Sequence, residues 1–474
     1  MYSIKSFSFT ASLIITLLLT ANGYSQTHTH NGNNEQHVHS SETSHTHNSV
    51  DYSFRTDSGQ YEPPKQGENG YYWWKGNLHT HTLWSDGDQF PEVVAQWYYK
   101  HGYHFLALSD HNTLMRGKKW VNLKTNRHAE AAGRMNIYDV YKERFGDDWV
   151  ETREVDGDFE IRLKPLNEVR SLFEQAGRFL MIESQEISKR HTVHINVTNS
   201  HEPIDALVGE TVEETIRSNF DAIAKIREDS GEEILPHLNH PNFRHAVTAE
   251  DMMGVGNLTM FEIYNGHRGT LNYGDDEGAI DLDRYWDIIL TKRLAELDLD
   301  LVYGVAVDDA HSYENSTNYN SRPGRGWVQV RTKYLTPEYV VRALENGNFY
   351  STTGVRVKDI QFDGSTYSLE VDPEDGIEYT IQFIGTREGY NPSSKSYIDD
   401  EGQMRDDRTR IYSDDIGVIL QESTGPEASY EFEGDEIYIR AKIISSKVKE
   451  NYFYEGEVET AWIQPVQQGM AMQP

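Results

Sequence analysis

The stretch from Gly76 to Gly87 contains side chains that could bind a metal ion. His79 and His81 are two residues apart, and in an extended strand such residues point to the same face. Two imidazoles on one face, at the end of a strand, can bind one ion. A Ser-Asp-Gly turn follows and would bring the carboxylate of Asp86 over the same mouth. The stretch therefore favours a metal site made of histidine and aspartate.

More His, Asp and Glu residues follow apolar runs further along the chain. The run that begins at Phe105, for example, ends in Asp110 and His111. Nitrogen and oxygen ligands in this mixture suit zinc, manganese or iron. A central carboxylate can bridge two ions, and two ions about 3.5–4 Å apart can activate one hydroxide for hydrolysis. The candidate ligands at predicted strand ends are His79, His81, Asp86, His111, Glu183 or Glu186, His194, His240, Asp309 and His311.

The elements that must position these ligands alternate between strand and helix. Residues 91–100 predict a helix, because Pro91 suits its first position and Gly102 its C-terminal cap. A strand at 103–109 completes a βαβ unit. Apolar strands that end in ligands are typical of a parallel barrel with its active site at the carboxyl ends of the strands. We expect further strands at 179–182, 233–236, 258–264 and 301–307, and helices at 212–228 and 285–294.

A long charged insertion is predicted at residues 113–178, with a hairpin around Val155–Asp158. It begins directly after His111, so we expect it to lie over the mouth of the site. Its cations could bind an anionic substrate or could be solvated surface charge; those near its start are Arg116, Lys118, Lys119 and Arg127.

The overall composition excludes several classes of protein. The 474 residues carry a formal net charge of −32, which argues against nucleic acid as a general partner and against docking on anionic lipid. The chain has no cysteine, which excludes disulfides, zinc-thiolate sites and thiol nucleophiles. Any metal must therefore be held by His, Asp and Glu.

The N-terminal part favours export. Residues 1–26 resemble a signal peptide, with Lys5 before an apolar run that is too short to span a bilayer, and with no lipid-anchor cysteine. We expect a periplasmic or secreted protein without a membrane anchor. Residues 27–70 are polar and predict a disordered linker. It carries three His-x-His pairs, which either capture metal loosely outside the cell or have no role; they are His28/His30, His37/His39 and His45/His47.

The pattern changes near residue 356. Short alternating runs separated by turns predict a small β-sandwich over 356–474. Its expected strands are Glu378–Phe383, Ile411–Leu420, Ile437–Ile444 and Thr460–Ile463. We find no chemistry in this region, so its expected role is to pack on the barrel; binding of a carbohydrate or of a partner is the alternative.

Eight short motifs between residues 71 and 355 contain the candidate ligands or polar residues near them. They are His79-Thr-His81, Ser85-Asp-Gly87, Ser109-Asp-His-Asn112, Gln185-Glu-Ile-Ser188, His194-Ile-Asn196, Asn239-His-Pro241, Glu262-Ile-Tyr-Asn265 and Asp309-Ala-His311. This set resembles the PHP (polymerase and histidinol phosphatase) superfamily, in particular its CehA/McbA-like metallohydrolase branch. The segments 342–354, 439–442 and 461–465 also resemble that branch.

The resemblance implies an α/β fold, a distorted (β/α)7 TIM-like barrel, with two or three divalent metal ions at its mouth. It implies phosphoester hydrolysis by a hydroxide that bridges two ions, with Glu186, Asp86 and His111 as catalytic residues. The first ion would take His79, His81, a bridging glutamate and Asp309; the second the same glutamate, His194 and His240; the third Asp86, His111 and His311. The motifs favour Glu186 over Glu183, His194 over His191 and Asp309 over Asp308, and leave His237 as a neighbour of the ligands.

The predicted function is therefore an exported, metal-dependent phosphoesterase acting on a small-molecule or oligomeric phosphoester. One alternative is hydrolysis of a carboxyl, carbamate or sulfate ester on the same site. Another is a periplasmic metal-binding protein without activity, suggested by the His-rich linker. Arginines near strand-end loops could bind the phosphate or form surface ion pairs, and the candidates are Arg190, Arg244 and Arg268.

Overall fold

The computed structural model describes residues 63–67, 70–130, 132–133, 135–189, 192–313 and 319–470. The chain divides into two units, Met1–Val50 and Asp51–Pro474, and all described residues belong to the second. The predicted signal peptide and most of the predicted linker therefore lie outside the described residues. The end of that linker is ordered, however, because strand β1 (Lys65–Gln66) pairs with residues Tyr72 and Trp73.

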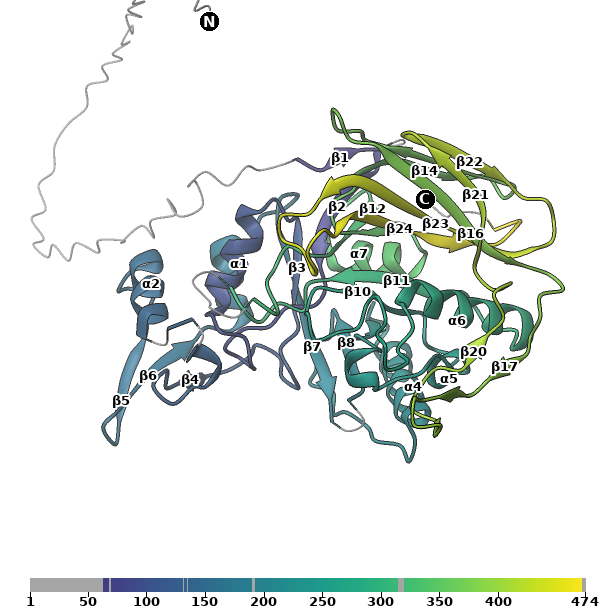
Figure 1. Cartoon of the computed structure of the whole chain (residues 1–474). Helices are drawn as coiled ribbons and strands as arrows, with labels where there is room; N and C mark the ends of the chain where they lie inside the picture. Colours follow the sequence, from purple (N-terminus) through teal and green to yellow (C-terminus); the bar gives the residue numbers. More distant parts are fainter. Residues whose placement is uncertain are drawn as a thin grey trace, which may run out of the picture. The chain divides into compact units, whose positions relative to one another are not determined.

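A mixed α/β fold is organised around one large sheet (Figure 1). Its order is β11-β10-β9-β8-β7-β3-β2-β12-β13-β24-β23-β16-β21. The strands of the first half are β2 (Tyr72–Asn77), β3 (Phe105–Leu108), β7 (Leu180–Ser188), β8 (His194–Thr198), β9 (Leu235–Leu238), β10 (Met260–Asn265) and β11 (Tyr303–Val307). Most of these residues are buried, as expected for strands covered on both faces.

The expected all-parallel arrangement is wrong for β8, which runs antiparallel to both β7 and β9. The reason is the short connection between Ser188 and His194, since a parallel return needs a crossover of about a dozen residues or more. As a result His194 begins its strand, and it still lies at the sheet edge where β7 ends, opposite Ser188.

A closed barrel is not found among the described residues. Strand β12 (Trp327–Thr332) pairs antiparallel with β2 from Tyr72 to Gly76, and so occupies the edge that β11 would need. The segments that follow β2 and β11 meet in one parallel bridge, between Thr80 and Ala310. The backbone N–H of His81 donates to the carbonyl of Ala310 at 3.0 Å, so the two chain segments that carry candidate ligands are tied together.

Helices cover the sheet where the sequence pattern predicts them. Helix α1 begins at Pro91, and the longest helix, α4, is capped by Thr211 and ends at Gly231 in the left-handed conformation. A large core cluster packs α4 to α7 against the sheet, and a second cluster packs α1 and α3. These helices are α1 (Pro91–Lys100), α3 (Leu166–Phe173), α4 (Val212–Ser230), α5 (Ala249–Met253), α6 (Leu282–Glu296) and α7 (Pro337–Glu345). None of the helices in the described ranges combines the length and apolar character that crossing a bilayer requires.

The insertion forms a small antiparallel sheet of its own with α2 (Met135–Phe145) beside it (Figure 1). Its strands are β4 (Lys119–Val121), β5 (Thr152–Val155) and β6 (Asp158–Leu163). The predicted hairpin is confirmed: Val155 pairs with Asp158, and Asp156 and Gly157 both have positive φ, as a type I′ turn requires.

The C-terminal region continues the large sheet. Strand β13 (Phe349–Thr352) pairs with β24 (Val458–Val466), followed by β23 (Glu436–Val448), β16 (Tyr379–Arg387) and β21 (Val418–Thr424). A second sheet of β14 (Val357–Phe362), β15 (Thr366–Val371) and β22 (Glu427–Glu431) packs on it through a third apolar cluster. The sheet thus runs across the boundary predicted at residue 356.

One predicted strand in this region is wrong, because Ile411–Leu420 is interrupted by a turn in which Gly417 has a φ of +66°. It is divided between β20 (Ile411–Tyr412) and β21. The remaining short strands are β17 (Ser394–Lys395), β18 (Tyr397–Ile398) and β19 (Met404–Arg405).

Candidate metal centre

Four donor atoms from three strand ends converge in the interior of the molecule. Nε2 of His79 lies 3.4 Å from Oε2 of Glu186 and 3.3 Å from Oδ1 of Asp309. Nε2 of His81 lies 3.4 Å and 3.2 Å from the same two oxygens. The two histidines follow β2, the glutamate is on β7 and the aspartate follows β11, so the sheet brings together residues that are far apart in the sequence.

These separations fit a metal ion better than hydrogen bonds. Bonds of about 2.0–2.1 Å in a tetrahedral site put neighbouring donors about 3.3–3.4 Å apart, whereas N–H···O hydrogen bonds are typically about 2.9 Å. Nε2 of His79, Nε2 of His81 and Oε2 of Glu186 are buried and form no hydrogen bond within the described residues. Buried polar atoms without partners are costly, and a shared cation would satisfy all three.

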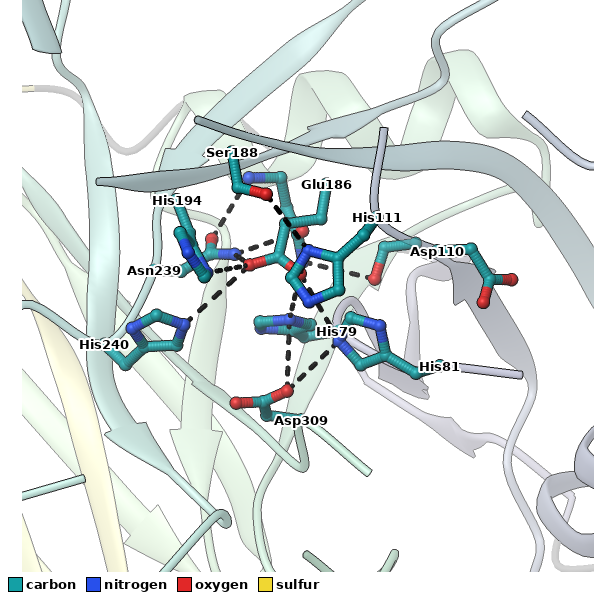
Figure 2. Close-up of polar contacts among 12 residues, drawn as sticks. His79, His81, Asp110, His111, Glu186, Ser188, His194, Asn239, His240 and Asp309 are labelled. Atoms are coloured by element: carbon teal, nitrogen blue, oxygen red, sulfur yellow. Dashed lines mark hydrogen bonds and ion pairs between the residues drawn. The ribbon is translucent and has the colours of Figure 1, made fainter. Parts of the chain in front are cut away.

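Glu186 is at the centre of this arrangement, and Glu183 is not part of it (Figure 2). The two are three residues apart on β7, so their side chains point to opposite faces of the strand. Glu183 forms a two-pronged ion pair with Arg116, at 2.6 Å and 2.8 Å. The alternation of the strand thus separates the two glutamates that the sequence left as alternatives.

A second group of donors meets the other oxygen of Glu186. Nδ1 of His194 lies 2.8 Å from Oε1 of Glu186, and Nε2 of His240 lies 3.8 Å from it. Asn239 donates from Nδ2 to the same oxygen at 2.9 Å, which fixes the orientation of the carboxylate. Glu186 therefore presents Oε2 to one group and Oε1 to the other.

A third group surrounds Asp86. Nε2 of His311 lies 3.4 Å from Oδ1 of Asp86, and Nε2 of His111 lies 3.5 Å from Oδ2. Nδ1 of His111 also lies 3.0 Å from Oε2 of Glu186, so this group adjoins the first. The structure thus brings the nine predicted ligands close together. Among these nine, donor atoms close enough to share an ion form three sets: His81, Asp86, His111 and His311; His79, His81 and Asp309; and His111, Glu186 and His194. These sets differ from those that the resemblance implied, because His81 and His111 each belong to two sets and His240 belongs to none.

The turn that carries Asp86 is held by Asp110. The Asp110 carboxylate accepts from the backbone N–H and the hydroxyl of Thr82, both at 2.8 Å, and from the Ser85 hydroxyl at 2.6 Å. It points away from the donors in Figure 2 and is not one of them. Gly87 closes the turn against the backbone of His81, where a Cβ atom would lie 2.6 Å from the carbonyl carbon and oxygen.

Glu262 is not a candidate ligand but contacts two of them, His79 and His240. Its Oε1 lies 2.7 Å from Nδ1 of His79, and its Oε2 accepts the backbone N–H of His240 at 2.7 Å. Asn265 donates to Oε2 at 2.8 Å, and His237 lies 3.3 Å from Oε1. A carboxylate on the far nitrogen of a metal-binding histidine fixes the ring and raises its basicity. The sequence named the motif that contains Glu262 but gave the residue no role.

The neighbouring residues Asp308 and Asp309 contact different parts of the molecule. Asp308 is buried and accepts from the hydroxyl of Tyr98 and from three backbone N–H groups, those of residues 324 to 326. It therefore holds the loop after β11 in place, and Asp309 is the one that faces the donors. His311 is oriented by Ser321, whose Oγ lies 3.0 Å from Nδ1 of the ring.

The histidines at this site keep the buried carboxylates in their ionised form. Burial opposes ionisation of Glu186, but His111, His194 and His79 hold the pKa of its carboxyl well below the usual range. Asp309 behaves in the same way: burial is outweighed by His79 and the other nearby histidines, and its pKa is well below normal. Burial lowers the pKa of His79, yet the surrounding carboxylates raise it well above 6.5. Carboxylates that remain ionised this deep in the protein are normally paired or bind metal.

The donors open into a pocket of about 420 Å³. Besides the candidate ligands it is lined by Arg127 and His128 of the insertion, by Phe243 and His267, and by Asp88, Ser312 and Ser321. His267 accepts the backbone N–H of Gly269 on Nδ1 at 2.9 Å, and burial lowers its pKa to about 4. The neutral ring therefore carries its hydrogen on Nε2. The sequence analysis missed His128 and His267, because neither lies in a recognisable motif.

Two of the three arginines predicted to bind substrate, Arg244 and Arg268, do not line this pocket. Arg244 is exposed, and its guanidinium lies 5.0 Å from the ring centre of Phe243. Arg268 donates to the backbone carbonyl of Tyr452 at 3.0 Å. Neither lines the pocket. Arg190, together with His191, lies outside the described residues.

Comparisons with known proteins include two distant structural likenesses. No protein-family model matches the chain, and no curated protein matches it. A two-domain protein from Bacteroides vulgatus ATCC 8482, said to contain a predicted PHP-like metal-dependent phosphoesterase, has a TM-score of 0.35 and 12% identity over 81% of this chain and 94% of that one. A protein from Bifidobacterium adolescentis ATCC 15703, whose proposed activity is that of a metal-dependent phosphoesterase, has a TM-score of 0.26 and 15% identity over 54% of this chain and 91% of that one. TM-scores below 0.5 support no conclusion about activity, which has to come from the site itself.

Proposed function

We propose that this chain is a metal-dependent hydrolase of phosphoric esters, of the CehA/McbA-like type within the PHP superfamily. The observation that carries the proposal is the set of four donor atoms on His79, His81, Glu186 and Asp309, with separations of 3.2–3.4 Å and no hydrogen bonds on the three buried atoms named above. The barrel-like arrangement, in which the segments after β2 and β11 meet at a single bridge, supports it.

We infer sites for two or three divalent ions from the donor set and the resemblance together. His79, His81, Glu186 and Asp309 would hold the first, and Glu186, His194 and His240 the second. Asp86, His111 and His311 would hold a third. Zinc, manganese and iron all accept such mixed nitrogen and oxygen ligands, and thiolate-selective ions are disfavoured because the chain has no cysteine. Divalent ions bound in such sites lower the pKa of water and stabilise negative charge on phosphoryl oxygens.

The protein's own contribution is to fix the donors before substrate arrives. Glu262 lies 2.7 Å from Nδ1 of His79 and 3.3 Å from Nε2 of His237, so it holds the His79 ring with Nε2 toward the other donors. Asn239 and Asn265 hold the carboxylates of Glu186 and Asp309. Because these supporting side chains are buried, the donors need little reorientation during the reaction. Such preorganised polar groups are the main source of electrostatic catalysis.

Export to the periplasm or the exterior remains part of the proposal. It is supported by the signal-like pattern in residues 1–26.

A panel of chromogenic esters tests the proposed function. The purified protein, loaded with zinc or manganese, is assayed on 4-nitrophenyl phosphate, bis(4-nitrophenyl) phosphate, 4-nitrophenyl acetate and 4-nitrophenyl sulfate. We expect turnover of a phosphate ester that Glu186→Gln abolishes and Glu183→Gln retains. The second variant is a matched control, since Glu183 is on the same strand and faces away. Turnover of only the acetate or the sulfate would reject phosphoester hydrolysis.

A further inference from the structure

Four cations near the start of the insertion could bind an anion, and the structure separates them. Arg116 is paired with Glu183 on both of its prongs. Lys119 donates to the backbone carbonyl of Trp84. Lys118 is exposed and does not line the pocket. Arg127 alone of the four lines the pocket that contains the metal donors.

The guanidinium of Arg127 forms no ion pair within the described part of the chain. Its Nε lies 3.3 Å from Nε2 of His128, and this is the one contact of its guanidinium within the described part of the chain. No carboxylate in that part pairs with it, although the chain as a whole is strongly acidic. The two terminal nitrogens thus remain available, and they are the atoms with which arginine holds phosphate oxygens.

Hydrogen bonds and buried neighbours hold the backbone around Arg127. Asn126 accepts the N–H groups of His128 and Ala129 on its side-chain oxygen, at 2.8 Å and 3.1 Å. Leu123 and Ala129, on either side, are fully or almost fully buried in the apolar cluster of the insertion. The arginine therefore projects from a fixed turn, which reduces the entropy lost when it binds a ligand.

His267 offers a second donor in the same pocket. It follows β10, the strand that ends in no candidate metal ligand. Its Nδ1 already accepts from Gly269, and its backbone N–H donates to the Asn265 side chain at 2.8 Å. These two bonds fix the ring with its Nε2 hydrogen free to donate to a substrate oxygen.

We propose that Arg127 and His267 bind a phosphate oxygen that faces away from the metal donors, and that they select phosphomonoesters over diesters. This inference rests on the proposed function. A monoester has three non-bridging oxygens and two negative charges at neutral pH. If two oxygens turn toward the metal donors, the third needs donors from the protein. A diester places an uncharged alkoxy group there, which gains nothing from a guanidinium.

The test combines binding and kinetics on the metal-loaded full chain. The affinity for inorganic phosphate is measured by calorimetry, and kcat/KM is measured on 4-nitrophenyl phosphate and bis(4-nitrophenyl) phosphate. Loss of a charge-assisted hydrogen bond should weaken phosphate binding and monoester turnover by about 10- to 100-fold in Arg127→Met, with diester turnover changed by less than about threefold. His267→Leu should act in the same direction, and His267→Gln, which keeps a donor, should restore part of the effect.

Lys124→Met is the matched control, because Lys124 is exposed on the same turn and does not line the pocket. It should leave both readouts unchanged. Unchanged phosphate affinity in Arg127→Met, or equal losses on both esters, would overturn the inference while the hydrolase assignment stands. If the unmodified protein hydrolyses no phosphoester but binds phosphate through Arg127, the proposed function fails and the anion site remains.

Discussion

Replacing Glu262 by glutamine should weaken metal binding without unfolding the protein. All of the carboxylate's partners depend on its having two acceptor oxygens: Nδ1 of His79 and Nε2 of His237 on one side, and N–H donors from His240 and Asn265 on the other. Glutamine has the same shape but only one acceptor. Whichever way the amide turns, its NH₂ group faces atoms that now act as donors.

The size of the effect follows from these contacts. If the NH₂ group faces His79, the ring must accept on Nδ1 and carry its hydrogen on Nε2, which removes the metal-binding lone pair. If it faces His240 and Asn265, two buried hydrogen bonds are lost, each worth about 1–3 kcal/mol. Changing the partner of a ligand histidine typically costs 10- to 100-fold in metal affinity. We therefore expect zinc to bind about 10- to 100-fold more weakly.

The assay is a competition titration of zinc against a chromophoric chelator, with thermal unfolding of the metal-free protein measured in parallel. Glu92→Gln is the matched control. Glu92 is equally buried and accepts from Tyr141 and Trp149, neither of which is a candidate ligand. Both variants should lose some stability, but only Glu262→Gln should lose affinity. A change in affinity of less than twofold in folded Glu262→Gln would refute the role given to this carboxylate.

Three further predictions concern stability and the turn at the site. Arg440 of β23 is buried and pairs with Asp287 of α6 at 2.7 Å, so Arg440→Met should lower the free energy of unfolding in urea by about 3–5 kcal/mol, because it leaves a buried charge alone; a loss below 1 kcal/mol would contradict this. Burial opposes ionisation of Asp283, but Lys442 and Arg440 lower its pKa from 3.8 to about 2. This group therefore stabilises the fold above about pH 4 and loses that contribution as the pH falls toward 2, so Asp283→Asn should show a shallower loss of stability over that range in chemical unfolding; parallel curves would show that the pair is not coupled to folding. Gly87→Ala should lower the Tm and the bound metal together, because its Cβ would meet the His81 backbone at 2.6 Å; an unchanged metal content would separate the turn from the site.

Much of the candidate site could be read from residue spacing. His79 and His81 face the same way because they are two apart in extended backbone, and the predicted helix at 91–100 is α1. The predicted hairpin at Val155–Asp158 depends on local turn chemistry alone. Such features are encoded within a few residues, so one sequence is enough to predict them.

Other features depend on contacts between distant parts of the chain. The closed barrel was not found because β12 pairs with the free edge of β2. The sequence around Trp327 contains no local pattern that predicts this pairing. The direction of β8 follows from the length of one loop. The choice among surface cations failed for Arg244 and Arg268, because whether an arginine lines a pocket or binds a backbone carbonyl is decided by tertiary packing.

The most direct test of the metal centre is a count of bound ions by elemental analysis after gel filtration. A chain that begins at Asp51 is used, since it keeps the second unit whole and removes the six histidines of the predicted linker, which would blur the count. We predict two or three equivalents of zinc or manganese per chain, with at least one equivalent lost in Glu186→Gln and none lost in Glu183→Gln. Zero or one equivalent in the folded protein, even after loading with excess metal, would contradict the multinuclear centre.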